Sequence, residues 1–411
     1  MNKFLVTVLV AVFLPGSVFA ADLDINGFLS AGGGIVLEDG RSYYGFDDSF
    51  GFSEDSKAGI QIGSQVTDKV SATVQITGLA SNGWEPEIEW AYVGYEFNEH
   101  WKARAGRLVA PYFMVSDYLK VGYAYPWIRP PSDTYGQIGI PAVDGMDVIY
   151  SNNVGDWDFQ AQAYSASYAN ELSLLGQDAD MDLNGMYGFI ATAGRDWLTL
   201  RASYHGAEMN IDIPALDELF GGIAMAGGGL VQAGTAMGFQ PLVDAGLSVL
   251  TVSQDLAIEA KDANFAEVGF VIDTDDWWFV RGEWTSLDFP RSIMADSETS
   301  YVTGGIRRNA FTYHLTFEQF ESTPEGGYSD PLVAASALLG SVDPTNAAIA
   351  GLDFLAASVA GVIGGPSERD TTTLGLRWDF AESTAFKLEY AQVSRGSSDD
   401  GVVSFVIDVI F

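Results

Sequence analysis

The sequence predicts an all-β fold, a transmembrane antiparallel β-barrel of about sixteen strands. Segments of about ten residues alternate apolar and polar side chains, and their connections alternate between short polar turns and longer segments. Beyond the N-terminal segment, the sequence has no charge-free run of about 18 apolar residues that would predict a transmembrane helix. A large soluble β-sandwich also alternates, but its apolar face is hidden from water and its connections seldom divide so regularly into short and long.

The N-terminal segment has the features of a secretory signal peptide. Its start at Met1–Lys3 is basic, an apolar run follows over Phe4–Leu14, and small residues precede a cleavage position after Ala20. We therefore expect residues 1–20 to be removed and residues 21–411 to form the exported barrel.

Composition excludes several classes of function. The chain has 55 acidic and 20 basic residues, a net charge of −35, which makes nucleic acid an implausible partner. It has no cysteine, so disulfides, thiol nucleophiles and cysteine-ligated metals are excluded. Despite its charge, 47% of the chain is hydrophobic.

The alternation is clearest in six segments. In each, one set of side chains would face lipid and the other an aqueous lumen. These segments span residues 70–77, 87–92, 198–205, 278–285, 311–318 and 373–380.

The connections supply the strand count, because seven short turns and eight longer segments imply about sixteen strands. The short turns lie near residues 67–69, 98–100, 153–156, 194–196, 274–276, 308–309 and 381–383. The longer segments span roughly 37–56, 79–86, 108–142, 166–181, 206–262, 287–299, 320–370 and 394–401. Trp157, Trp197, Trp277 and Trp378 lie beside short turns, as an interfacial aromatic belt requires.

Residues 108–142 form the most unusual connection. They contain five prolines and many aromatic side chains without a period-2 pattern, which indicates a long loop between two strands. Its aromatic rings must pack on something, which argues against disorder. We expect this loop to fold inward and to narrow a pore.

Two further stretches carry a resemblance to a known family. The chain ends in an alternating strand, Val403–Phe411, whose terminal phenylalanine is similar to the assembly signal of bacterial outer-membrane barrels. Ala105-Gly106-Arg107, the long loop and Asp144–Tyr150 resemble the fifth strand, third loop and sixth strand of Gram-negative general porins. Residues 130–136 depart from the acidic loop tip common in that family, so its constriction residues are not transferred to this chain.

The resemblance implies a homotrimeric porin in the outer membrane of a Gram-negative bacterium, in contact with lipid and lipopolysaccharide. It also implies that Phe411 presents the last strand to the barrel-assembly machinery.

Strand parity and loop position select the candidate pore-lining residues. Charges around a constriction set the selectivity of a pore, although mixed charges also simply keep a lumen wet. By parity we expect inward side chains at Lys102, Arg104, Asp144, Arg201, Arg281 and Arg377, together with Glu89, Glu267 and Glu389. Arg107 lies at the junction of strand and loop, and the loop itself offers Asp117, Lys120, Arg129 and Asp133.

The segments 206–262 and 320–370 are rich in Ala, Leu and Gly, and we interpret them as extracellular loops with short helices. We expect lids or vestibule packing rather than a recognition site.

Enzymatic chemistry has little support. His100, His205 and His314 are scattered, and no phosphate-binding loop, dinucleotide fingerprint or metal-ligand spacing occurs. Ser203 and His205 share one strand face, which is too common a pairing to indicate a hydrolase. We therefore expect no catalytic residues, metal or cofactor.

The favoured function is passive diffusion of small hydrophilic solutes and ions, with cation preference because the predicted external loops are acidic. Those carboxylates would equally serve divalent-ion bridges to lipopolysaccharide. One alternative is a selective channel for sugars or small organic ions, with Tyr118, Tyr123, Tyr125 and Trp127 as an aromatic track. Another is a non-conducting adhesin whose two insertions plug the mouth.

Overall fold

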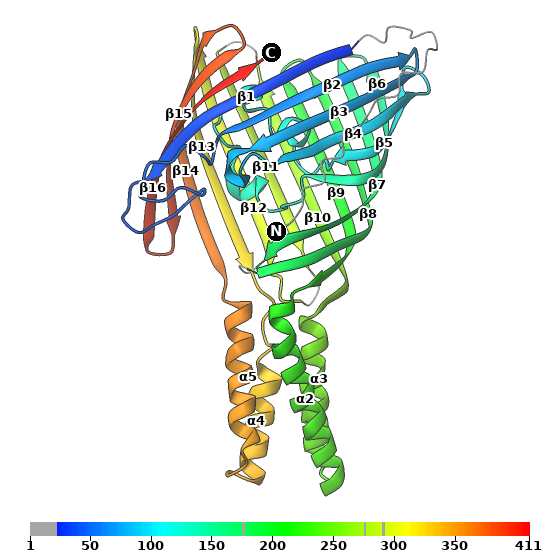
Figure 1. Cartoon of the computed structure of the whole chain (residues 1–411), viewed down its shortest axis with the longest axis vertical. Coiled ribbons are helices and arrows are strands. Elements are labelled where there is room, and N and C mark those ends of the chain that lie inside the picture. Colours follow the sequence, from blue (N-terminus) through cyan, green and yellow to red (C-terminus); the bar gives the residue numbers. More distant parts are fainter. Residues whose placement is uncertain (1–22, 175–176, 275–276, 290–291) are drawn as a thin grey trace, which may run out of the picture.

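The computed structural model describes residues 23–174, 177–274, 277–289 and 292–411. The predicted signal peptide, residues 1–20, lies outside these ranges. Each strand pairs antiparallel with its neighbours in the chain, and β1 pairs with β16, so the sheet closes into a barrel (Figure 1). This confirms the predicted fold class.

The described residues form sixteen strands. They are β1 (Leu23–Val36), β2 (Lys57–Thr67), β3 (Val70–Leu79), β4 (Pro86–Glu96), β5 (Trp101–Val109), β6 (Ala142–Val154), β7 (Trp157–Leu174), β8 (Gln177–Arg195), β9 (Leu198–Asp212), β10 (Ile258–Asp273), β11 (Trp278–Asp288), β12 (Asp296–Arg308), β13 (Phe311–Thr323), β14 (Ser367–Ala381), β15 (Thr384–Arg395) and β16 (Ser398–Ile410).

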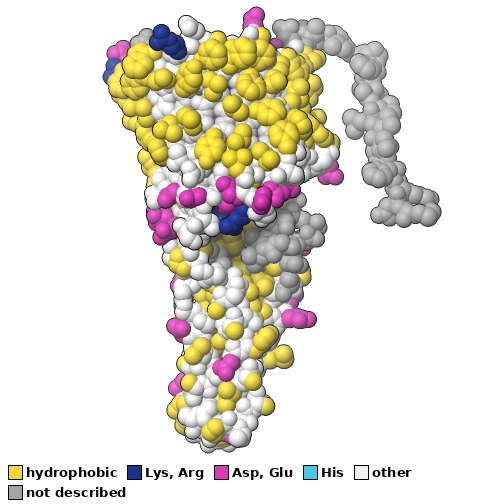
Figure 2. All heavy atoms as spheres, turned by 90° about the vertical axis from the view of Figure 1, so that its left-hand side faces the viewer, with side chains coloured by type: hydrophobic (Ala, Val, Ile, Leu, Met, Phe, Trp, Pro, Cys, Tyr) yellow, Lys and Arg dark blue, Asp and Glu magenta, His cyan; other side chains and the backbone are white. Residues whose placement is uncertain are grey.

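Strand β13 shows how the sequence pattern produces two different surfaces. Phe311, Tyr313, Leu315 and Phe317 are exposed on the outside, while the intervening Thr312, His314, Thr316 and Glu318 are buried inside. The outer wall is largely hydrophobic (Figure 2), as a surface in contact with lipid must be. Trp197, Trp277 and Trp378 are exposed beside short turns, which fits an aromatic belt.

Two predicted long loops are strands instead. Strands β7 and β8 remain paired as far as Leu174 and Gln177, and β15 and β16 as far as Arg395 and Ser398. The interpretation of residues 166–181 and 394–401 as loops was therefore wrong. Strands pair through backbone hydrogen bonds, which do not require apolar side chains. Beyond the apolar band of the wall, the alternation of apolar and polar side chains therefore stops before the strand itself ends.

The two long insertions form helical hairpins. Helices α2 (Pro214–Met237) and α3 (Gln240–Leu256) connect β9 to β10, and α4 (Asp330–Val342) and α5 (Ala348–Ile363) connect β13 to β14. Both pairs project from the end of the barrel opposite the C-terminus (Figure 1). They are longer than the short helices we expected. By length and composition alone, residues 216–237 of α2 could cross a membrane, which corrects the expectation that no segment beyond the N-terminus could do so.

The four helices pack against one another as a bundle. Buried apolar residues recur at helical spacing, and α3 buries Leu242, Gly246, Val249, Val252 and Leu256. Helices α2 and α3 lie very close together at Gly227 and Gly246. A Cβ on Gly246 would lie only 2.7 Å from the carbonyl oxygen of Gly227, so the contact requires glycine. The buried apolar residues of the bundle form one hydrophobic cluster with apolar residues of the barrel interior and of the loop within it.

Candidate functional site

The constriction loop leaves β5 at Val109 and enters β6 at Ala142. It carries the short helices η2 (Ser116–Tyr118), η3 (Gly122–Ala124) and α1 (Ser132–Tyr135). A further short helix, η1 (Ala80–Asn82), connects β3 to β4. The loop lies inside the barrel, and Tyr125 and Trp127 are each only 1% exposed. The expectation that this segment folds inward is confirmed.

Hydrogen bonds attach the loop to one side of the wall. The indole Nε1 of Trp127 lies 3.1 Å from both Thr303 Oγ1 on β12 and Thr316 Oγ1 on β13. The backbone N–H of Ile128 donates to Glu389 at 2.7 Å, and that of Thr134 donates to Glu318 at 2.9 Å. Wall side chains thus satisfy the backbone groups that an irregular segment leaves unpaired.

Basic side chains of the wall bind the loop carbonyls. Lys387 Nζ donates to the carbonyl oxygens of Gly122 and Trp127, each at 2.6 Å. Arg377 donates to the carbonyls of Tyr123 at 2.7 Å and Tyr125 at 3.0 Å. Arg201 contacts the carbonyls of Pro111 and Tyr112, so cations hold the loop at several places along its length.

The loop also contacts the connection between β1 and β2, and strand β16. Arg129 Nη1 lies 2.6 Å from Asp55 Oδ2, its Nη2 donates to Ser404, and its guanidinium lies 4.4 Å from the centre of the Tyr44 ring. Burial raises the pKa of the Asp55 carboxyl, although Arg129 beside it acts in the opposite direction. Asp133, in α1, pairs with Arg369 of β14.

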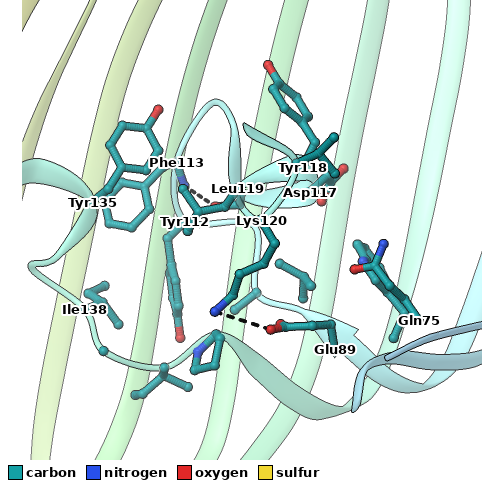
Figure 3. Close-up of a pocket in the computed structure, with 18 residues that line it drawn as sticks. Gln75, Glu89, Tyr112, Phe113, Asp117, Tyr118, Leu119, Lys120, Tyr135 and Ile138 are labelled. Carbon is teal, nitrogen blue, oxygen red and sulfur yellow. Dashed lines mark hydrogen bonds and ion pairs between the residues drawn. The ribbon is translucent and has the colours of Figure 1, made fainter. Parts of the chain in front are cut away.

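The remaining opening lies between the constriction loop and strands β3 to β5. It is a cavity of about 230 Å³, and Figure 3 shows Lys120 of the loop reaching toward Glu89 of β4 across it. Lys120 Nζ lies 3.4 Å from Glu89 Oε1, and Thr77 also donates to this carboxylate at 3.1 Å. Asp117 is exposed at the same opening. One ion pair therefore joins the loop to the opposite wall at the narrow part.

Two more cavities continue from this opening. Toward the helices, a cavity of about 480 Å³ shares Tyr112 and Ile138–Ile140 with it. Toward the chain termini, a cavity of about 370 Å³ shares Gln75 and Val121 with it. The shared lining residues show that the three cavities adjoin one another, and the Lys120–Glu89 pair lies in the middle one.

The predicted site residues fall into four groups, the last of which, Arg107 and Asp144, lies on the outer face. Asp117 and Lys120 line the opening. Arg129, Asp133, Arg201, Arg281 and Arg377 anchor the loop, with Arg281 stacked 4.8 Å from the Trp127 ring centre. Arg104 pairs with Asp147 on the wall, and Lys102 pairs with Glu96 near a short turn.

Arg107 and Asp144 do not line the lumen. They lie opposite one another in the β5–β6 ladder, 3.5 Å apart, and Asp144 is 67% exposed on the face that carries Met146 and Val148. That face is the outside of the barrel, so the inward assignment of Asp144 is corrected. Its parity was misjudged because the period-2 pattern is interrupted between the loop and β6.

Several residues that shape the site were not among the candidates. Lys387, Asp147 and Asp408 are buried charged groups of the lumen wall. Strand parity assigned Glu389 to the inner face, and the same parity places Lys387 on that face. No local sequence pattern, however, shows that Lys387 contacts the loop.

The strand face with Ser203 and His205 does not form a catalytic pair. Ser203 Oγ donates to Glu267 at 3.2 Å, and His205 Nδ1 lies 2.9 Å from the Tyr164 hydroxyl.

Comparison with known proteins identifies the fold. No family model and no curated protein sequence matches the chain. Among solved structures, it is similar to the outer membrane channel DcaP of Acinetobacter baumannii, with a TM-score of 0.55 and 11% identity over 95% of this chain and 97% of that one. An anion-selective porin from Comamonas acidovorans gives 0.54 and 12% over 95% and 100%. The trimer form of OmpT, an outer membrane protein of Vibrio cholerae, gives 0.51 and 10% over 95% and 100%.

Proposed function

We propose that this chain, which has the fold of the sixteen-stranded porins, is a non-enzymatic outer-membrane channel for passive diffusion of small hydrophilic solutes and ions. The observation that carries the proposal is the internal loop. It leaves an opening whose lining includes the charged side chains of Asp117, Lys120 and Glu89, and further cavities adjoin this opening on both sides.

Cation preference is part of the proposal. Acidic side chains form a band between the hydrophobic wall and the helices (Figure 2). Exposed acidic residues also include Asp39, Asp47 and Asp48 in the connection between β1 and β2, and Asp399 at the start of β16. A negative rim concentrates cations within a Debye length of about 8–10 Å. The fold does not itself decide selectivity, because a similar barrel from Comamonas acidovorans is anion-selective.

We further propose a homotrimer in contact with outer-membrane lipid and lipopolysaccharide. The apolar wall supports the lipid contact, and the acidic rim would bind divalent ions that bridge to lipopolysaccharide phosphates. A trimer form is recorded for the Vibrio cholerae protein of similar fold. Phe411 would present β16 to the assembly machinery, since its side chain is 71% exposed.

The positions of the four aromatic rings give little support to the predicted aromatic track for sugars. Tyr125 and Trp127 are buried against the wall, which leaves Tyr118 and Tyr123 as members that a solute can reach. A track of four rings is therefore excluded. Selectivity for sugars or small organic ions would have to arise elsewhere along the route.

Reconstitution of the full chain in a planar bilayer tests the proposal. We expect stepwise currents, grouped in threes for a trimer, and a reversal potential in a KCl gradient of the sign given by a cation-preferring pore. Block that saturates with solute concentration would favour a selective channel over size exclusion. A folded, inserted protein that passes no current would support the adhesin alternative and reject the channel.

A further inference from the structure

The cavity between the constriction loop and the base of the helices differs from the rest of the lumen. It is lined by the ends of β8 to β11 and by residues 136–140 of the loop, and its volume is about 480 Å³. Among the described residues that line it, none is Asp, Glu, Lys or Arg. The neighbouring constriction, in contrast, has Glu89, Asp117 and Lys120 in its wall.

Methionine, tyrosine and phenylalanine make up eight of the twenty residues that line this cavity. Met181, Met186, Met209 and Met294 line the cavity, which is four of the nine methionines in the chain. The rings of Tyr112 and Phe265 lie beside them, with centroids 5.8 Å apart at nearly right angles. Methionine side chains adapt to the shape of a ligand, and their sulfur atoms contact aromatic rings favourably.

The cavity is too large to be a packing defect. Protein interiors hold few voids larger than a water molecule, whereas pockets for small ligands measure about 300–1,000 Å³. Its position also matters, because Tyr112 and Ile138–Ile140 border both this cavity and the constriction. A solute held here would lie on the route just before the narrow part.

From these observations we infer that the cavity is a binding site for small neutral aromatic solutes that enter the channel from the helix side. The inference rests on the proposed channel and adds a class of solute to it. A charged ligand is disfavoured because no described lining side chain would compensate the loss of hydration. An aromatic ring with at most one polar group is favoured over a sugar, because sulfur atoms, rings and aliphatic groups make up most of the lining, and its hydrogen-bonding side chains are Gln137, His205, Asn264 and the hydroxyls of Tyr112 and Tyr164.

The test measures binding of 5-fluoroindole by ¹⁹F NMR to the full chain in lipid nanodiscs, with empty nanodiscs as the reference for partition into lipid. The double variant Met181→Gln/Met294→Gln preserves side-chain length while making the cavity polar. We expect its Kd to rise about tenfold or more, since small changes in an apolar pocket have effects of this size. Met225→Gln is the matched control, because Met225 is 76% exposed on α2 and does not line the cavity.

Wild-type signal no greater than that of empty nanodiscs, or equal affinity in the double variant, would overturn the inference. Should the double variant fail to fold, Met294→Gln alone replaces it, because Met294 lies outside the strands. Current recordings on the same samples separate the two proposals: binding without current rejects the channel, and current without binding rejects only the aromatic site.

Discussion

Lys387 of β15 and Asp408 of β16 form an ion pair, with Nζ and Oδ2 2.9 Å apart and neither side chain more than 2% exposed. The same ammonium group binds two carbonyls of the constriction loop, and Ser30 donates to the carboxylate from β1. One buried pair thus connects the strand that closes the barrel with the loop that narrows it.

Lys387→Met should destabilise the barrel by about 3–5 kcal/mol, because it leaves Asp408 buried without its cationic partner. The loop also loses two hydrogen bonds, so current noise should rise. Urea unfolding in vesicles and single-channel recording measure the two effects. Lys387→Met/Asp408→Asn should regain part of the stability, and Lys69→Met, in an exposed turn, should have no effect. Equal stability of Lys387→Met and wild type would contradict the role of the pair.

Lys120→Ala should increase single-channel conductance, because Lys120 joins the loop to Glu89 across the opening. It should also shift the reversal potential toward stronger cation preference. Lys102→Ala is the matched control, since Lys102 pairs with Glu96 near a short turn and does not line the opening. Conductance changes of the same size in both variants would place the narrow part elsewhere.

Glu89→Gln should weaken cation preference while nearly preserving side-chain size. A unit charge about 7 Å from a passing ion in water contributes about 0.6 kcal/mol, which changes the local cation concentration roughly two- to threefold. The reversal potential in a KCl gradient measures this change. Glu218→Gln on α2 removes the same charge from the helical bundle and should leave the potential unaltered.

Replacing residues 212–257 by Asn-Gly should preserve the barrel, because Ile211 and Ile258 are paired and a two-residue turn can join them. The shortened protein should retain the heat-modifiable gel mobility of a folded barrel. Conductance should be equal or greater, since α2 and α3 stand above the mouth. Loss of folding would show that the helices are needed to form the barrel.

Phe411→Ala should reduce assembly in cells but not refolding in detergent. Its backbone bonds to Gly27, at 2.7 and 3.0 Å, remain possible without the ring. Deletion of Phe411 removes those bonds as well and should impair both processes. Ile410→Ala serves as the neighbouring control. Normal cellular assembly of Phe411→Ala would argue against recognition of the terminal side chain.

The sequence by itself determined the barrel, the central parts of its strands and the inward loop. A period of two is a local property, so Phe311 to Glu318 reveals which side chains face lipid without knowledge of any partner strand. The prolines and aromatic rings of residues 108–142 likewise exclude a strand and demand a packing surface.

Tertiary structure alone decided which charged groups meet. Arg129 lies between Asp55 and Ser404, and Lys387 reaches residues 122 and 127, because barrel closure brings together strands that are far apart in the chain. Register also placed Arg107 and Asp144 on the outer face. Side-chain alternation determines the face on which a residue lies. Which charged group it meets across the lumen depends on the complete closed sheet and on the path of the loop within it.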